Sequence, residues 1–390
     1  MAIINRIGDF QDEMTAWRRD LHAHPEIGFE ETRTSAMVAA KLRAFGFDEV
    51  HTGLATTGVV GVLKAGSGGR AIGLRADMDA LPIEEMTGLS YASRNTGRMH
   101  ACGHDGHTTM LLGAARYLAE TRNFDGIVYF IFQPAEEMMA GGRVMVEEGL
   151  FERFPAEQVF GMHNWPRMPV GTFAMRPGPV MAAADRIAIR LTGRGGHGAM
   201  PHHACDPVVA GAQIVSALQT IVARNADPIE RAVVSITQFH AGDADNVIPQ
   251  TAFLGGTARS FTPEMRDLLE RRLGEIARGV GQALGVEAAV TYERGYPPTV
   301  NSDAETELAA CAAAAVVGGD QVDRAPAPVM GAEDFAFMLE RRPGSYVFIG
   351  NGGGEDAPMV HHPKYNFNDE ALPFGASYWS KLVEQLLPAR

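Results

Sequence analysis

Apolar residues along the chain recur at two spacings, which predict alternating helices and strands in its first part. Residues 30–45 carry apolar side chains at helical spacing and end at Gly46, a residue type that suits the end of a helix. Short apolar runs at 59–63 and 71–74 predict strands, and 108–118 predicts a helix directly after a cluster of Cys and His. Such alternation is typical of a mainly parallel sheet with helices on both faces.

The pattern changes near residue 184 and changes back near residue 296. Residues 186–192 alternate polar and apolar side chains, as in a strand with one face in water. After this strand we expect a helix at 207–222, strands at 232–239 and 252–261, a helix at 263–284 and a strand at 287–293. This order is ferredoxin-like. We therefore predict an α/β domain from residues 1–183 and 296–390, with an α+β domain inserted at 184–295.

Composition and charge limit the possible partners and location. The 390 residues exceed the usual size of one core, and 46% hydrophobic with 21% charged residues is typical of a globular protein. The net charge of -13 argues against nucleic acid or an anionic membrane as partner. No signal peptide and no segment of membrane-spanning length is expected. Cys102, Cys205 and Cys311 are too scattered for a disulfide framework, which favours the cytoplasm.

The residues from His100 to His107 contain the first candidate metal ligands. Cys102 and His104 lie two residues apart among glycines, and a thiolate close to an imidazole is typical of metal binding. Further along the chain, His163 follows an apolar run of strand type at 158–160. Ligands scattered over several segments favour a catalytic site between loops over a compact structural site.

Two more segments could complete such a site. Glu136 and Glu137 follow the apolar run 127–132, at a strand end where open α/β sheets bind ligands. One carboxylate could bind a metal while its neighbour takes a proton from water, although adjacent carboxylates are often only a solvated surface. His361 and His362 offer a further ligand, and we expect only one of them to bind because adjacent side chains on extended backbone point apart.

Other polar residues have less specific patterns. Asp77 and Asp79 at a strand end could bind metal, orient ligand histidines, or simply cap the strand. In the inserted domain, His197 lies in a glycine-rich turn and could donate to an oxyanion, whereas nucleotide binding is disfavoured because the P-loop lysine and serine are missing. Arg259 lies on an otherwise apolar strand, where we expect a buried arginine to pair with a carboxylate, and Asn246 could add an amide donor.

Taken together, these segments resemble the M20 metallopeptidases, in the amidohydrolase branch that includes hippurate hydrolase and the auxin-conjugate hydrolases. The resemblance covers nearly the whole chain, from residue 21 to residue 369. Its markers are residues 75–82, 99–107, 133–137, 331–334 and 361–363. Several motifs in the same order are a specific signal.

The resemblance implies a metal-dependent hydrolysis of N-acyl amino acids to a carboxylic acid and an amino acid. It implies two divalent ions, zinc or manganese first and cobalt or nickel next, held by Cys102, His104, Glu137, His163 and His361. Cys102 would bridge the ions, Glu136 would be the general base, and Asp79 would orient a ligand. Asp77 stands where many members have a ligand histidine, which His104 replaces.

For the inserted domain, the resemblance implies a lid that also forms the interface of a homodimer or homotetramer. His197 would bind the scissile carbonyl, in relatives often from the partner subunit, and Arg259 with Asn246 would meet the substrate carboxylate. The alternatives are a dipeptidase or aminoacylase using the same site, a non-catalytic metal-binding module, and a zinc-stabilised structural protein.

Overall fold

The computed structural model describes residues 3–389, which form two compact units. Unit 1 extends to Val180 and also includes Val300–Ala327 and the chain from Asp334 onward, and unit 2 consists of Met181–Thr299 and Pro328–Glu333. The second segment of unit 2 lies outside the inserted range expected from the sequence. It is held by backbone hydrogen bonds, because the N–H of Ala182 donates to the carbonyl oxygens of Val329 and Gly331 at 3.2 and 2.9 Å.

Unit 1 contains an eight-stranded sheet in the order β1-β2-β4-β3-β5-β16-β6-β15. Its centre, β4-β3-β5-β16, is parallel, which confirms the predicted α/β class, whereas β1 and β2 are antiparallel. The strands are β1 (Glu49–Leu54), β2 (Gly58–Ala65), β3 (Ala71–Asp77), β4 (Gly126–Gln133), β5 (Gln158–Pro166), β6 (Phe173–Ala174), β15 (Val322–Asp323) and β16 (Gly344–Gly352). β7 (Gly178–Met181) and β14 (Thr299–Asn301) form a separate pair.

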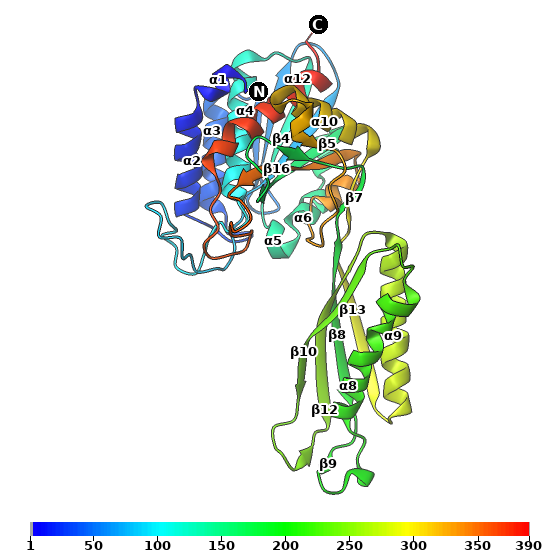
Figure 1. The fold of residues 1–390 in the computed structure, drawn as a ribbon. Coiled ribbons are helices and arrows are strands. Elements are labelled where there is room, and N and C mark those ends of the chain that lie inside the picture. Colours follow the sequence, from blue (N-terminus) through cyan, green and yellow to red (C-terminus); the bar gives the residue numbers. More distant parts are fainter. Residues whose placement is uncertain (1–2, 390) are drawn as a thin grey trace. The chain divides into compact units, whose positions relative to one another are not determined.

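Helices cover this sheet (Figure 1). The long ones are α2 (Gln11–Ala23), α3 (Thr32–Ala44), α4 (His104–Thr121), α10 (Asp303–Val317) and α12 (Leu372–Leu386). Helix α12 packs between α4 and α10 over a core that includes Leu74, Phe130 and Trp379. The short helices are α1 (Asn5–Gly8), α5 (Glu136–Met139), α6 (Gly141–Glu147), α7 (Leu150–Arg153) and α11 (Ala336–Leu339).

The start of α4 differs from the sequence prediction in a way that matters for the site. The helix begins at His104 rather than at residue 108, so the second half of the Cys/His cluster forms its first turn. Gly103 precedes it with φ at 93°, a backbone conformation that glycine adopts readily. A Cβ there would lie 2.3 Å from the Asn164 side chain, so this turn requires glycine.

Unit 2 is a four-stranded antiparallel sheet in the order β10-β12-β8-β13, which is the predicted ferredoxin-like arrangement. Its strands are β8 (Ala183–Thr192), β10 (Ala232–Ala241), β12 (Thr251–Ser260) and β13 (Glu287–Tyr296), and β9 (Gly196–His197) pairs with β11 (Val247–Ile248). Helices α8 (Pro207–Leu218) and α9 (Pro263–Ala283) lie on one side of the sheet (Figure 1). Asp206 and Thr262 cap these helices with side-chain oxygens, and a proline follows each cap.

One helical stretch of unit 2 bears on the expectation that no segment has membrane-spanning length. By length and composition alone, Pro207–Asn225 is apolar and long enough to cross a membrane, with 33% of it buried. Its buried residues Ala210, Ile214 and Leu218 pack in the core of unit 2. A single such helix is weak evidence for a membrane span, because core helices pass the same test of length and composition.

Candidate metal centre

Segments far apart in the sequence meet at the carboxyl ends of the parallel strands of unit 1. The register of β3 with β4 pairs Asp77 with Gln133, and its register with β5 pairs Arg75 with Gly161, two residues before His163. Cys102 lies just before α4, and His361 lies in the loop after β16. Parallel strands present their carboxyl ends at one edge of a sheet, so this edge gathers side chains from all these segments.

The five predicted ligands come together in space. Sγ of Cys102 lies 3.2 Å from Nε2 of His163. Oε1 of Glu137 lies 3.2 Å from Nε2 of His361 and 3.8 Å from Nε2 of His104. Cys102 belongs to two groups, one with His104 and His163 and one with Glu137 and His361, and the ligand atoms of each lie within 4.8 Å of one another. Donor atoms bound to one zinc ion at ~2.0–2.3 Å lie up to about 4.6 Å apart, so each group has nearly the size of one ion site.

Of the two adjacent histidines near the carboxyl end, His361 reaches this cluster. Its side chain is 52% exposed, against 9% for Glu137 beside it. Its backbone has φ at 68°, and its N–H donates to the carbonyl oxygen of Ala101 at 2.7 Å. Nδ1 of His362 instead accepts the N–H of Lys364 at 3.0 Å, within a local turn.

Asp79 connects two of the five side chains. Its Oδ1 lies 3.1 Å from Nδ1 of His104, and its Oδ2 accepts the backbone N–H of Glu137 at 3.0 Å. A histidine that donates from Nδ1 keeps the lone pair of Nε2 available for a metal. Asp79 is itself 2% exposed, so its orientation is fixed by packing.

The hydrogen bonds of His107 distinguish supporting residues from ligands. Its Nε2 accepts the backbone N–H of Asn164 at 2.9 Å, so Nδ1 carries the proton and donates to Oδ1 of Asp77 at 2.7 Å. The other oxygen of Asp77 accepts from Arg75 at 2.6 Å. Although both residues form a close group with His104, their coordinating atoms are already engaged. We therefore interpret Asp77 and His107 as supports.

Asn164 is a further support. Its Nδ2 donates to the carbonyl oxygen of Cys102 at 2.6 Å, and its Oδ1 accepts the hydroxyl of Tyr365 at 2.7 Å. Its own carbonyl oxygen accepts Nδ1–H of the ligand candidate His163 at 2.6 Å. His163 thereby keeps Nε2 directed at Cys102.

The electrostatics of the cluster favour a cation. Burial, with Glu137 and Glu136 adding to it, raises the pKa of the Cys102 thiol well above its usual range. Burial lowers the pKa of His104, but nearby carboxylates, led by Asp77, outweigh burial and raise it to about 10. Nearby carboxylates contribute to both shifts, and a divalent cation would offset their negative charge.

The donor atoms fit a metal as well. Within residues 3–389, Nε2 of His104 and Oε1 of Glu137 are buried without a hydrogen-bond partner, as ligand atoms facing an ion would be. Burial, followed by the neighbouring His107, lowers the pKa of His163 well below its usual range, so its imidazole is neutral as a ligand must be. Sulfur, nitrogen and oxygen donors together suit zinc and related divalent ions.

Glu136 lies at the edge of this cluster. It is 6% exposed, forms a close group with His104 and Glu137, and its Oε1 accepts the backbone N–H of Asp334 at 3.3 Å. Asp334 is held in turn by Arg75 at 3.1 Å. A carboxylate next to a metal ligand, with its backbone on the same turn, is placed to exchange a proton with water at the cluster.

In unit 2 the structure brings two of the three predicted substrate contacts together and leaves the third apart. His197 of β9 pairs with Val247 of β11, and the N–H of Gly198 donates to the carbonyl oxygen of Asn246 at 2.7 Å. Arg259 lies near the carboxyl end of β12, the end away from His197, and pairs with Ala184 of β8. The eight residue-to-residue steps of strand from 251 to 259 span about 26 Å at ~3.3 Å per residue.

Arg259 makes its hydrogen bonds to uncharged groups. It is half-buried and donates to the hydroxyl of Thr257 and to the carbonyl oxygen of Ala258. Burial lowers the pKa of its guanidinium. The nearby Asp185 is engaged by Arg266 at 3.0 Å and by Tyr292 at 2.6 Å. Over residues 3–389, Arg259 forms no ion pair, which leaves its charge for a ligand.

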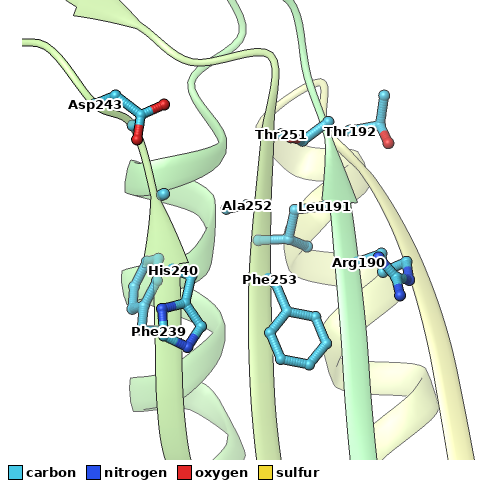
Figure 2. Close-up of a pocket in the computed structure, with 11 residues that line it drawn as sticks. Arg190, Leu191, Thr192, Phe239, His240, Asp243, Thr251, Ala252 and Phe253 are labelled. Carbon is cyan, nitrogen blue, oxygen red and sulfur yellow. The ribbon is translucent and has the colours of Figure 1, made fainter.

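A groove of about 610 Å³ lies over the end of this sheet and is distinct from the metal cluster. Figure 2 shows His240, Phe253 and Arg190 in one row across three neighbouring strands. The Arg190 guanidinium lies 5.7 Å from the centre of the Phe253 ring, and the His240 ring stacks on the other side at 6.3 Å.

Sequence reasoning did not single out several residues that support the cluster. His107 lies in the motif with Cys102, but nothing in its spacing separates a support from a ligand. Asn164 follows His163 directly, and Tyr365 follows His361 by four residues. Both act through tertiary contacts that have no periodic signal in the sequence.

Comparisons with known proteins agree on one family. A model of peptidase family M20/M25/M40 matches residues 73–385. A hippurate hydrolase of Campylobacter jejuni is 43% identical over 387 residues, which is 99% of this chain and 100% of that protein. An N-acetylcysteine deacetylase of Bacillus subtilis is 40% identical and covers 96% of this chain and 97% of that protein. The crystal structure of the Bacillus subtilis YxeP protein, described as a dinuclear metal-binding peptidase, is 37% identical with a TM-score of 0.85 and covers 97% and 99% of the two chains.

Proposed function

The chain belongs to peptidase family M20, and with this membership as premise we propose that it hydrolyses N-acyl amino acids to a carboxylic acid and a free amino acid. It is a metal-dependent amidohydrolase, as its full-length relatives at 43% and 40% identity indicate. The observation that carries the proposal is the convergence of Cys102, His104, Glu137, His163 and His361 next to the carboxylate of Glu136.

We propose that these five side chains hold two divalent ions. Cys102 is common to both ligand groups and would contribute to holding both ions. Bound there, the ions would supply Lewis-acid polarisation of the amide carbonyl and would lower the pKa of water. Sulfur favours zinc, and the histidine and carboxylate donors also admit manganese, cobalt or nickel. Asp79 supports this arrangement by orienting His104 and holding the backbone of Glu137.

The chain's own residues move the proton. Glu136 takes a proton from the attacking water and returns it to the leaving nitrogen, so that the amide C–N bond breaks and the C–O bond of the acid forms. His197 is proposed to donate a hydrogen bond to the carbonyl oxygen as charge develops on it. Arg259 is proposed to bind the carboxylate of the amino acid, which is supported by its hydrogen bonds to uncharged groups and by the lack of an ion pair to it within residues 3–389.

We further propose that one substrate is contacted by His197 of one subunit and Arg259 of another, and not by both residues of the same subunit. About 26 Å of strand separates the two ends of β12, far more than the length of an N-acyl amino acid. A homodimer or homotetramer through the inserted domain would bring His197 of one chain to the substrate of another. The exposed valines of the 207–225 helical stretch, Val208, Val209 and Val222, offer an apolar surface for such contact.

A cytoplasmic location is part of the same proposal. Cys102, Cys205 and Cys311 are all unpaired, as is usual for proteins of a reducing compartment. The substrate is a small molecule, and the net charge of -13 disfavours nucleic acid or an anionic membrane surface as partner.

A substrate panel tests the proposal. The protein is stripped of metal, reloaded separately with zinc, manganese, cobalt or nickel, and assayed against benzoyl-, acetyl- and indolyl-acyl amino acids and against dipeptides. We expect metal-dependent release of free amino acid from at least one N-acyl series. Faster cleavage of dipeptides would favour the dipeptidase alternative, and no turnover with any ion would contradict the proposal.

A further inference from the structure

The turn that presents Glu136 and Glu137 is held by a carboxylate about 100 residues earlier in the chain. Glu31 precedes α3 and is 0% exposed. Its Oε1 accepts the backbone N–H of Ala135 at 2.8 Å, and its Oε2 accepts the hydroxyl of Thr57 at 2.6 Å. Each oxygen accepts one of these hydrogen bonds, and one of the two donors is the residue directly before Glu136.

Ala135 is in a conformation that needs outside support. Its φ and ψ are 54° and 43°, in the left-handed region that residues with a side chain adopt only infrequently. Its carbonyl oxygen accepts the N–H of Gly141 at 2.9 Å, so Glu31 supplies the remaining backbone contact. Gly28 packs closely below, since a Cβ on it would lie only 3.0 Å from Cβ of Ala135.

We propose that Glu31 is a positioning residue, which holds Ala135 in this conformation and thereby fixes the directions of Glu136 and Glu137. The inference rests on the proposed function, because the roles of base and ligand belong to it. A rotation at Ala135 would move both carboxylates together. A displacement of about 1 Å at such groups can cost about 100-fold in rate.

A purely structural role explains the carboxylate at this position poorly. Within residues 3–389, Glu31 forms no ion pair with Lys, Arg or His, and its facing groups are Thr57, the Ala135 N–H and, at longer range, Asp79. Burial, with a smaller contribution from Asp79, raises the pKa of Glu31 to about 7. A buried acid without a cation is costly, and an apolar side chain of similar volume would serve stability as well or better.

Two substitutions at one position separate the roles. Glu31→Gln keeps a side-chain oxygen for the Ala135 N–H, whereas Glu31→Met keeps the volume, removes the buried charge and leaves no strong acceptor. With zinc-loaded protein we expect Glu31→Met to lose on the order of 100-fold in kcat with little change in KM. It should also bind zinc more weakly in a titration of the metal-stripped protein. Glu31→Gln should retain most of both properties.

Thr57→Val is the matched control, because it removes the other hydrogen bond of Glu31 and leaves the Ala135 contact in place. Thr57→Val should lower the melting temperature without the loss of kcat and zinc affinity. Glu30→Gln, at the exposed residue next to Glu31, should change neither kcat nor zinc affinity. Unchanged kcat and zinc affinity in Glu31→Met, or an equal loss in Thr57→Val, would overturn the inference. If the unmodified protein hydrolyses no N-acyl amino acid, the function fails instead, and the zinc titrations still decide the role of Glu31.

Discussion

The predicted functional residues of unit 1 and unit 2 are held in opposite ways. In unit 1, the candidate ligands and Glu136 are mostly buried, and His104, His163 and Glu137 each make a hydrogen bond to a further residue or its backbone. In unit 2, His197 is exposed, and its Nδ1 accepts a local N–H, that of Ala199 at 3.0 Å. The candidate ligands are therefore preorganised by their own unit, whereas the proposed contact to substrate from His197 is not.

This difference suggests a division of work. Ligands of metal ions need fixed geometry and gain it from buried hydrogen bonds. Residues that meet a substrate must allow entry and release, so an exposed position on a separate unit suits them. The distance along β12 between its His197 end and Arg259 supports the proposal that these two residues of one chain do not contact the same small molecule.

The largest effect is expected in the buried cluster of unit 1. Glu136→Gln should lower kcat by ~10²–10⁴, because the amide cannot accept the proton of water. Zinc binding should be unchanged, as Glu136 is not among the five proposed ligands. Glu137→Gln, the matched substitution one residue along, should weaken zinc binding as well. Near-full activity of Glu136→Gln would contradict its role as the base.

The next largest effect is expected at the exposed His197 of unit 2. His197→Ala should lower kcat by ~10²–10³, as expected for loss of an oxyanion donor, with zinc binding unchanged. If His197 acts across subunits, refolding His197→Ala together with Glu136→Gln should restore on the order of a quarter of the wild-type activity, since half the random dimers carry one intact site.

The same mixture decides between the two arrangements. Restoration of activity requires that His197 and Glu136 come from different chains. Each variant measured alone at the same total concentration is the control. A mixture no more active than the sum of its components would contradict the shared site and would place both residues in one subunit.

A smaller effect should distinguish the pH dependence of the stability of unit 1 from that of unit 2. In unit 1, Nδ1 of the buried His22 contacts Asp105 at 2.8 Å and Nε2 contacts Glu85 at 3.3 Å. Burial lowers the pKa of His22, but Asp105 and Glu85 outweigh it and raise the pKa from 6.5 to about 9. Because the folded pKa is the higher one, this stability is present below pH 6.5 and is lost as pH rises through 9, by at most about 3 kcal/mol.

Chemical denaturation at several pH values measures this effect. The unfolding free energy of unit 1 should fall between pH 6.5 and pH 9, and His22→Gln should flatten the fall because glutamine cannot take up a proton. The transition of unit 2 serves as the internal reference. An equal slope in His22→Gln and in the unmodified protein would show that other groups set the pH dependence.

The layers of both units and the members of the metal cluster could be predicted from the sequence, but from different signals. Strand and helix periodicity identified the parallel centre of unit 1 and the ferredoxin-like order of unit 2. The edge strand β1, with its mostly exposed residues, has no apolar run and was missed. Motif spacing identified Cys102 and His104, although the helix that carries His104 begins four residues earlier than predicted.

What the sequence could not provide is the set of tertiary hydrogen bonds. The contacts of Asn164 with Cys102 and of Glu31 with Ala135 join residues that are 62 and 104 positions apart. No periodic pattern marks such pairs. The separation of His197 from Arg259 was hidden for the same reason, because it depends on strand register rather than on the presence of either residue.

The number of metal ions bound per chain tests the central claim most directly. Metal-stripped protein is titrated with zinc while bound metal and hydrolysis of an N-acyl amino acid are followed together, for the unmodified chain and for Cys102→Ser. We predict two ions per chain with activity rising to its maximum as the second is bound, and weaker binding of both in the variant. Full activity in the stripped protein, or unaltered metal binding in Cys102→Ser, would contradict the account.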